Sequence, residues 1–238
     1  YEISLGLVGS EMCIRDRTSI AGYYTIQWRV IFNHTGLDNS AVGTIVIVND
    51  VAVEYSSLPY TVWVDNGSTI TYAYEELISS TVDGKRFILE NVDGCPSPIT
   101  VSSPEDITGN YLTQWLVTFT QTGLDNSAVG TIVTVNEVAL SIDDLPYSIW
   151  VNGGDTVIYS YTALVQTIQS GKRFVLSSVS GAPSPITVNS KIDVTGAYLT
   201  QWLVTFTHTG LDNTAIGTIV TVNGVNASYS ELPYSIWV

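Results

Sequence analysis

The residues that could do chemistry in this chain are few, and they recur at a fixed spacing. The only histidines are His34 and His208, and the matching position between them is Gln121. A zinc site uses several such ligands, and a histidine that transfers protons would have to be dispensable in one copy. We therefore expect both histidines to be exposed loop residues, and we predict no metal site.

Asp-Asn pairs recur after a glycine at Asp38-Asn39, Asp125-Asn126 and Asp212-Asn213. Oxygen atoms of this kind bind Ca²⁺, which takes six to eight of them, but the spacing lacks the alternating acidic pattern of a calcium loop. Asp and Asn also cap turns through bonds to their own backbone, without any ion. The sequence favours the turn and leaves bound calcium open.

Two cationic pairs, Lys85-Arg86 and Lys172-Arg173, stand out in an acidic chain. They could pair across a sheet or contact an acidic neighbour. Lysine on an exposed edge strand also protects that edge against unwanted pairing. The edge-strand interpretation is the one that we expect.

Tyrosines occupy alternate positions, and therefore one face, of two predicted strands: Tyr72, Tyr74, Tyr159 and Tyr161. If exposed, this face could stack on sugar rings or on another protein; if buried, it is core. We keep these four residues as a possible binding face, with the core as the favoured alternative.

Catalytic and cofactor motifs are absent from the sequence, which shows no nucleophile elbow, P-loop, paired metal motif or nucleotide fingerprint. The formal charge of −14 would repel a phosphate backbone. We predict a non-enzymatic protein without a cofactor and without a nucleic-acid partner.

These residues are positioned by a pattern that repeats every 87 residues. Thr-Gly-Leu-Asp-Asn begins at Thr35, Thr122 and Thr209, and the six tryptophans form two series, Trp28, Trp115, Trp202 and Trp63, Trp150, Trp237. Repetition at a fixed period is typical of an array of small units. We expect repeats at residues 18–104 and 105–191 and a truncated third at 192–238, whose incomplete core should be partly disordered or prone to aggregate.

Within the second repeat, apolar residues alternate over 111–120, which predicts a strand with one apolar face. Further strands are expected at 131–135, 147–151, 156–162 and 172–179, while 163–171 could be a loop, an edge or one helical turn. Asn136-Glu137 aligns with Asn223-Gly224 in the third repeat. Because Asn-Gly between apolar alternations is a strong hairpin signal, we predict a hairpin turn at each copy.

Short strands separated by turns every 8 to 12 residues favour an all-β fold of tandem antiparallel β-sandwiches. The Trp28, Trp115 and Trp202 strands, and Leu-Pro-Tyr leading into Tyr60-Thr-Val-Trp-Val, resemble the immunoglobulin-like or fibronectin-III-like repeats of archaeal and bacterial cell-surface proteins. There is no Cys…Trp…Cys framework. Trp63-Val-Asp-Asn-Gly followed by Gly84-Lys-Arg-Phe also resembles internalin-type B repeats, which implies a β-grasp-like alternative.

The first seventeen residues match nothing in the repeat. They resemble the peptide produced when a sequencing adapter is translated, a contaminant of metagenome-derived sequences, and we predict a non-native leader over residues 1–17. Glycosylation sequons at Asn33, Asn66 and Asn226 permit an extracellular or cell-envelope location. We expect the chain to be a fragment, with membrane contact only through an anchor outside it.

The resemblance implies a non-enzymatic extracellular segment that acts as a stalk, spacer or adhesive array, with other cell-surface proteins or glycans as partners. One alternative is a set of accessory, carbohydrate-binding repeats of a larger secreted hydrolase. Another is a subunit of a filament or surface layer, which would self-associate.

Overall fold

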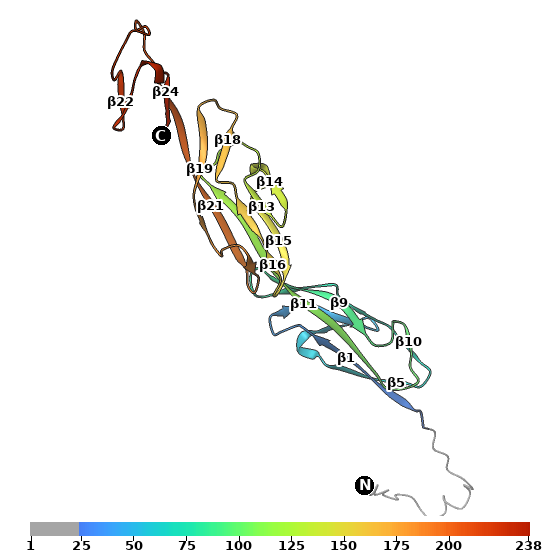
Figure 1. Cartoon of the computed structure of the whole chain (residues 1–238). Coiled ribbons are helices and arrows are strands. Elements are labelled where there is room, and N and C mark those ends of the chain that lie inside the picture. The colour runs from blue at the N-terminus through green and yellow to red at the C-terminus, as the bar shows by residue number, and fades with distance from the viewer. Residues whose placement is uncertain (1–23) are drawn as a thin grey trace, which may run out of the picture.

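The computed structural model describes residues 24–238 as an elongated all-β chain (Figure 1). The all-β prediction is confirmed, since the helical segments of the described residues are single 3₁₀ turns. The predicted leader at residues 1–17 lies outside the described residues. No helix within 24–238 has the length and apolar character that a membrane span needs.

The secondary-structure elements recur along the chain with the period of the sequence. Residues 24–104 hold β1 (Gln27–Thr35), β2 (Ala41–Val42), β3 (Thr44–Val48), β4 (Val51–Glu54), η2 (Tyr55–Ser57), β5 (Tyr60–Asp65), β6 (Thr69–Ile70), β7 (Tyr72–Tyr74), β8 (Leu77–Ser80), β9 (Lys85–Asp93) and β10 (Ile99–Thr100).

Residues 105–191 hold β11 (Glu105–Thr122), β12 (Ala128–Val129), β13 (Val133–Val135), β14 (Val138–Leu140), η3 (Ile142–Asp144), β15 (Tyr147–Asn152), β16 (Thr156–Val157), β17 (Tyr159–Tyr161), β18 (Leu164–Thr167), β19 (Lys172–Ser180) and β20 (Ile186–Thr187). The last part of the chain holds β21 (Ile192–Phe206), β22 (Val220–Val222), β23 (Val225–Ala227), η4 (Tyr229–Glu231) and β24 (Tyr234–Trp237).

One large sheet runs through both complete repeats, and β11 is its spine. The first part of β11 pairs in parallel with β1 and antiparallel with β9. Its last part pairs antiparallel with β15 and in parallel with β21. The predicted repeat boundaries fall where β11 and β21 begin, so each of these strands completes one repeat before it opens the next.

Two hydrophobic cores flank the middle of β11. Odd-numbered residues of this strand share one face: Ile107 and Tyr111 are buried in the first core, and Val117 and Phe119 in the second. The alternation predicted for 111–120 therefore supplies both cores. The first core also takes side chains from the sheet β4-β3-β7, and the second from β14-β13-β17.

The predicted hairpin turn is confirmed in all three copies. Asn136 and Glu137 have positive φ angles of 44° and 70°, between the paired strands β13 and β14. Such angles define a turn whose twist matches that of the flanking strands. The undecided segment 163–171 contains the strand β18, which pairs with β19.

The third repeat is less enclosed than the other two. Val204, which matches the fully buried Val117, is 36% exposed. Apart from the last part of β21, the third repeat holds the strands β22, β23 and β24 and the 3₁₀ turn η4. The predicted disorder or aggregation of residues 192–238 stays a prediction.

Candidate functional site: the junctions between repeats

The four tyrosines proposed as a binding face lie in or against the cores. Tyr74, Tyr159 and Tyr161 are buried, and Tyr72 is half-buried. Each hydroxyl donates a hydrogen bond to a backbone carbonyl: Tyr72 to Cys95 (2.7 Å), Tyr74 to Asn33 (2.7 Å), Tyr159 to Ala182 (2.7 Å) and Tyr161 to Thr120 (2.6 Å). Burial raises the pKa of Tyr161 to about 12. The rings therefore pack the interior and offer no exposed platform for stacking.

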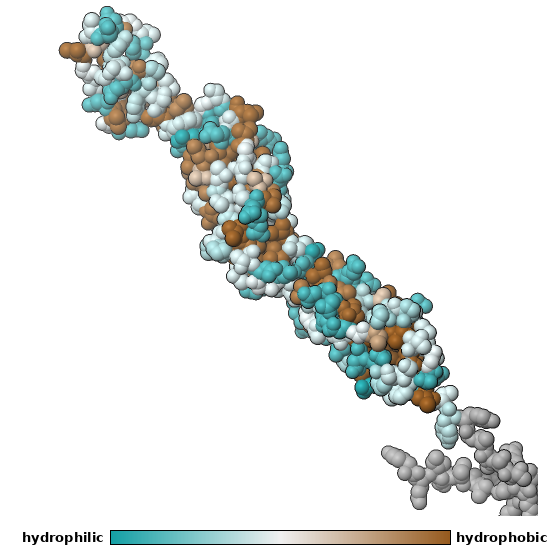
Figure 2. All heavy atoms as spheres, turned by 45° about the vertical axis from the view of Figure 1, so that its right-hand side comes forward, coloured by the Kyte–Doolittle hydropathy of each residue, from teal (hydrophilic) through white to brown (hydrophobic). Residues whose placement is uncertain are grey.

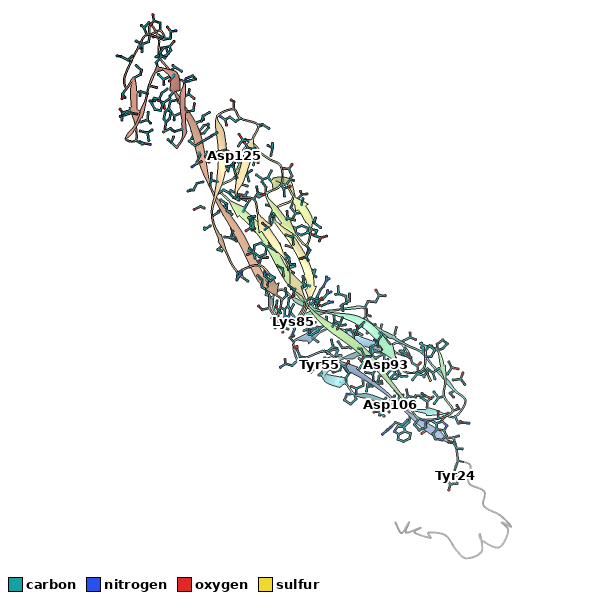
Figure 3. All side chains as sticks on the ribbon, in the orientation of Figure 1. Tyr24, Tyr55, Lys85, Asp93, Asp106 and Asp125 are labelled. Carbon is teal, nitrogen blue, oxygen red and sulfur yellow. The ribbon has the colours of Figure 1, made fainter. Side chains whose placement is uncertain are left out.

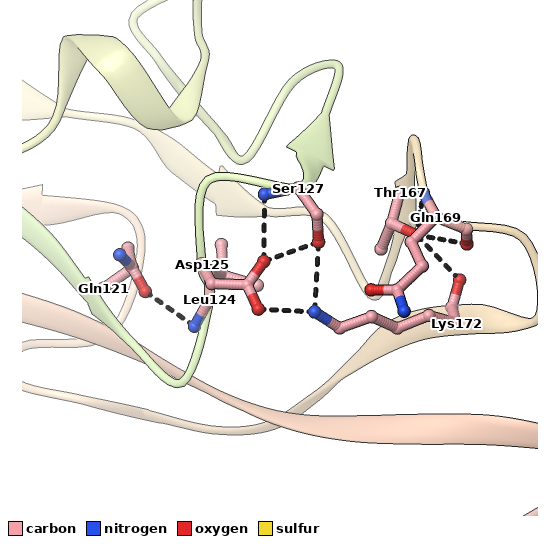
Figure 4. Close-up of polar contacts among 7 residues, drawn as sticks. All are labelled: Gln121, Leu124, Asp125, Ser127, Thr167, Gln169 and Lys172. Carbon is pink, nitrogen blue, oxygen red and sulfur yellow. Dashed lines mark hydrogen bonds and ion pairs between the residues drawn. The ribbon is translucent and has the colours of Figure 1, made fainter.

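Lys85 and Lys172 are not the exposed edge residues that we expected. Strand β9 is paired on both sides, with β8 and β11, so it is not an edge strand. The ammonium of Lys172 forms an ion pair with Asp125 and lies 3.1 Å from Ser127 Oγ (Figure 4). Lys85 forms the same contacts with Asp38 and Ser40. The edge-strand interpretation is wrong because the sheet continues past these residues.

The Asp-Asn pairs cap turns, and two of their carboxylates bind a lysine. One oxygen of Asp125 accepts bonds from Ser127, while the other faces Lys172. The hydrogen bond from Lys172, with those from Ser127, lowers the pKa of Asp125 to about 2. The pKa of Asp38 is also about 2, because hydrogen bonds from Lys85 and Ser40 outweigh the opposite effect of partial burial.

An ammonium group thus stands where a bound cation would neutralise these carboxylates. Among residues 24–238 no group of three or more His, Cys, Asp or Glu side chains is arranged to hold a metal ion.

The histidines pack against tyrosines instead of projecting freely from loops. The ring of His34 lies 5.1 Å from that of Tyr55, and the ring of His208 lies 4.8 Å from that of Tyr229. Burial lowers the pKa of His34. In the second repeat the matching residues are Gln121 and Ile142, so histidine and tyrosine are replaced together.

The three glycosylation sequons lie on the surface. Asn33, Asn66 and Asn226 are exposed. All three side chains already accept a hydrogen bond: Asn33 Oδ1 from the backbone N–H of His34 (2.8 Å), Asn66 Oδ1 from Trp28 Nε1 (2.9 Å) and Asn226 Oδ1 from Thr221 Oγ1 (2.7 Å).

The most elaborate polar arrangement lies where one repeat meets the next (Figure 3, around Lys85). Arg86, on β9, stacks over the ring of Trp150, on β15, with 4.3 Å between the guanidinium carbon and the ring centroid. Its Nε donates to Gln114 Oε1 (2.8 Å), and Gln114 Nε2 donates to Asn152 Oδ1 (2.9 Å). Lys85 Nζ lies 5.5 Å from the ring centroid of Trp115.

The same arrangement recurs one period later. Arg173 lies 4.1 Å from the ring centroid of Trp237 and donates to Gln201 Oε1 at 2.8 Å. Lys172 Nζ lies 5.7 Å from the ring of Trp202. We call these two clusters the junctions. Each couples a Lys-Arg strand of one repeat to a tryptophan pair of the next.

The first junction has an additional tie across the repeats. Lys191, just before β21, forms an ion pair with Asp83 in the first repeat (2.7 Å). The matching positions are Pro104 and Ser170, so this pair is not part of the repeated pattern. A hollow of about 320 Å³ lies beside it, lined by Val82, Lys85, Arg86 and Trp150 among others.

The sequence indicates the Lys-Arg pairs and the tryptophans separately, and it does not predict that they meet. The signal available was their common period, since the Lys-Arg pairs, the glutamines before the tryptophans and both tryptophan series all repeat. The chain matches no protein-family model, no curated protein and no solved structure.

Proposed function

We propose that this chain is a non-enzymatic, extracellular tandem-repeat segment that acts as a stalk, spacer or adhesive array of a cell-envelope protein. The observation that carries the proposal is the continuity of β11, which belongs to both cores and leaves no linker between them. A strand of 18 residues spans about 60 Å. A chain joined in this way extends by a fixed step with each repeat.

The junctions support the same role. A guanidinium over an indole contributes about 0.5–2 kcal/mol, depending on how far it is desolvated. At the first junction the stacked Arg86 also donates a hydrogen bond to Gln114, and its strand β9 pairs with β11. Together these contacts resist bending between the repeats, which a flexible linker would permit. Stiffness of this kind serves a spacer, and repetition lets weak binding to surface proteins or glycans gain avidity.

The fold within each repeat is proposed to be an immunoglobulin-like sandwich. Each core lies between the large sheet and a three-stranded sheet, and the described residues contain no α-helix. These features favour the sandwich over the β-grasp-like alternative.

The surface is compatible with an exposed location. Figure 2 shows hydrophilic and hydrophobic residues interspersed over one face of the elongated chain. The accessory carbohydrate-binding alternative draws no support from the tyrosine face, because those rings are buried.

Two measurements test the proposal. Small-angle X-ray scattering should give an elongated particle, and duplication of one 87-residue repeat should lengthen it by a constant step. Antibodies raised against residues 24–238 should label intact source cells. A compact particle, or labelling only after cell lysis, would contradict the proposal.

A further inference from the structure

Each junction has two halves. The donor half is the Lys-Arg strand of one repeat. The receiving half belongs to the next repeat and consists, at the first junction, of Tyr111, Gln114, Trp115, Trp150 and Asn152.

The receiving tyrosine enters the core of the donor repeat. Tyr111 is buried in the first core, and its hydroxyl donates to the carbonyl of Glu75 at 2.9 Å. Tyr198 is likewise buried in the second core, and its hydroxyl donates to the carbonyl of Thr162 at 2.9 Å.

The N-terminal end of the first repeat carries a third receiving half, formed by Tyr24, Gln27, Trp28, Trp63 and Asp65 at the matching positions. We call it the end face. Tyr24, labelled at the end of the described chain in Figure 3, is 95% exposed, whereas Tyr111 is 4% exposed. Trp63 is 62% exposed, although its counterpart Trp150 is covered by an arginine. Among residues 24–238, the end face therefore has the receiving residues without a Lys-Arg strand against them.

The end face is already organised as the occupied junction is. Gln27 Nε2 donates to Asp65 Oδ1 at 2.9 Å, as Gln114 does to Asn152 at 2.9 Å. The backbone N–H of Asn66 donates to the carbonyl of Ile26 at 2.8 Å, as that of Gly153 does to Thr113. Among the described residues Gln27 Oε1 accepts no hydrogen bond, and this is the atom whose counterpart binds Arg86.

The backbone and the charge of the end face also suit a cationic strand. Residues 27–29 pair with β5 on one side, but the parallel pairing of β1 with β11 begins only at Val30. The other edge of 27–29 is unpaired among the described residues, where the matching part of β11 pairs with β9. Asp65 adds a carboxylate where the first junction has the neutral Asn152. An exposed strand edge accepts an added strand through main-chain hydrogen bonds. The carboxylate of Asp65 beside this edge favours a strand with a positive charge.

We propose that the end face is a docking surface for a further repeat unit of this type, one that presents a Lys-Arg strand. In the complex the arginine stacks on Trp63 and donates to Gln27, the strand pairs with residues 24–29, and Tyr24 enters the core of the added unit. The proposal deepens the array function and rests on it, since it describes how one more step is added.

Besides Asp65, three positions of the strand at residues 24–29 differ from the first junction. Thr25 stands where the junction has Leu112, Ile26 where it has Thr113, and Arg29 where it has Leu116. The contact of Leu116 that joins the repeats is its backbone N–H, which donates to the carbonyl of Gly84 at 2.9 Å. Arginine retains this backbone donor, so the substitution does not remove the contact.

A duplication variant tests the proposal on the whole chain. A second copy of residues 24–110 is inserted between Tyr23 and Tyr24, so that its Asn110 leads into Tyr24 as it normally leads into Tyr111. Hydrogen exchange is followed at residues 24–29. We expect exchange there to slow by about 100-fold or more, towards the rate of residues 111–116 in the same molecule.

The matched control carries Lys85→Ala and Arg86→Ala in the inserted copy only. It should lose most of the added protection at residues 24–29 while the inserted core stays protected. Unchanged exchange at 24–29 in the duplication variant, or equal protection in the control, would overturn the docking proposal. Either failure would be distinguishable from failure of the array function, because particle length and cell-surface labelling of the original chain are measured independently.

Discussion

At the scale of single residues, the ion pairs that join a buried lysine to an exposed aspartate should make the repeats sensitive to acid. Lys172 is 7% exposed, and Asp125 is its only ion-pair partner among the described residues. The folded-state pKa of Asp125, about 2, lies below its ordinary value of 3.8. The contribution of this ion pair to the free energy of unfolding is therefore complete above about pH 4 and is lost as the pH falls towards 2.

We predict that Asp125→Asn lowers the free energy of unfolding at neutral pH, since it leaves a buried ammonium without its counter-charge. The difference from the unsubstituted chain should shrink between pH 4 and pH 2, because acid removes the same charge from Asp125. Urea unfolding at a series of pH values measures this difference. Asp143→Asn is the control, because Asp143 is exposed and makes no ion pair within the described residues. If the difference in unfolding free energy between Asp125→Asn and the unsubstituted chain stayed constant down to pH 2, the prediction would be refuted.

What the sequence could reveal about these residues was their recurrence rather than their surroundings. The period-two alternation placed Tyr159 and Tyr161 on one face, but alternation alone does not say whether that face is inside. For Lys172, the general rarity of buried lysine favoured exposure. The partner that permits burial, Asp125, lies 47 residues away in the chain, so no local pattern could reveal it.

At the scale of elements, the hairpin between β13 and β14 contains a removable strain. Glu137 has a φ of 70°, and a non-glycine residue in this region costs about 1–2 kcal/mol. The third repeat has Gly224 at the matching position. Glycine relieves the strain but adds freedom to the unfolded chain, which offsets part of the gain.

We predict that Glu137→Gly stabilises the chain by about 0.5–1 kcal/mol. Thermal unfolding followed by circular dichroism would show a higher melting temperature. Glu137→Ala removes the same side-chain charge but keeps a Cβ, so it should not stabilise. If both variants shifted the melting temperature equally, the charge and not the backbone would be the cause.

The strands were predictable to different degrees. Most were visible from alternation and turn residues, because both are local properties. The sequence does not decide between strand and loop for residues 163–171, since β18 is only four residues long and gains its stability from pairing with β19. It also does not predict the full length of β11. Its first residues look like a link between repeats, and only their pairing with β1 and β9 makes them part of the sheet.

At the scale of the whole molecule, the period of 87 residues predicted an array but not how its members are joined. Arg86 and Trp150 meet because β11 carries the second repeat against the end of β9, and that contact depends on the complete course of both strands. The two junctions are near copies, which allows one to serve as the control for the other.

We predict that Arg86→Ala makes the first junction more flexible without unfolding either core. The loss of the guanidinium over Trp150 and of its bond to Gln114 should weaken the junction by about 1–2 kcal/mol, while the continuous β11 keeps the repeats joined. Spin labels at Ser57 and Ser177, with Cys13 and Cys95 replaced by serine, would report the distance between the repeats. The distance distribution should broaden in the variant.

Arg173→Ala makes the equivalent change at the second junction. That junction joins the second repeat to the third, so it does not hold the two labelled repeats together. It should leave the distribution unchanged, so broadening confined to Arg86→Ala would assign the stiffness to the first junction. Equal broadening in both variants would instead indicate a general loosening of the fold. If neither variant broadened the distribution, the shared strand β11 alone would account for the rigidity of the array, and the stacked arginines would be dispensable for it.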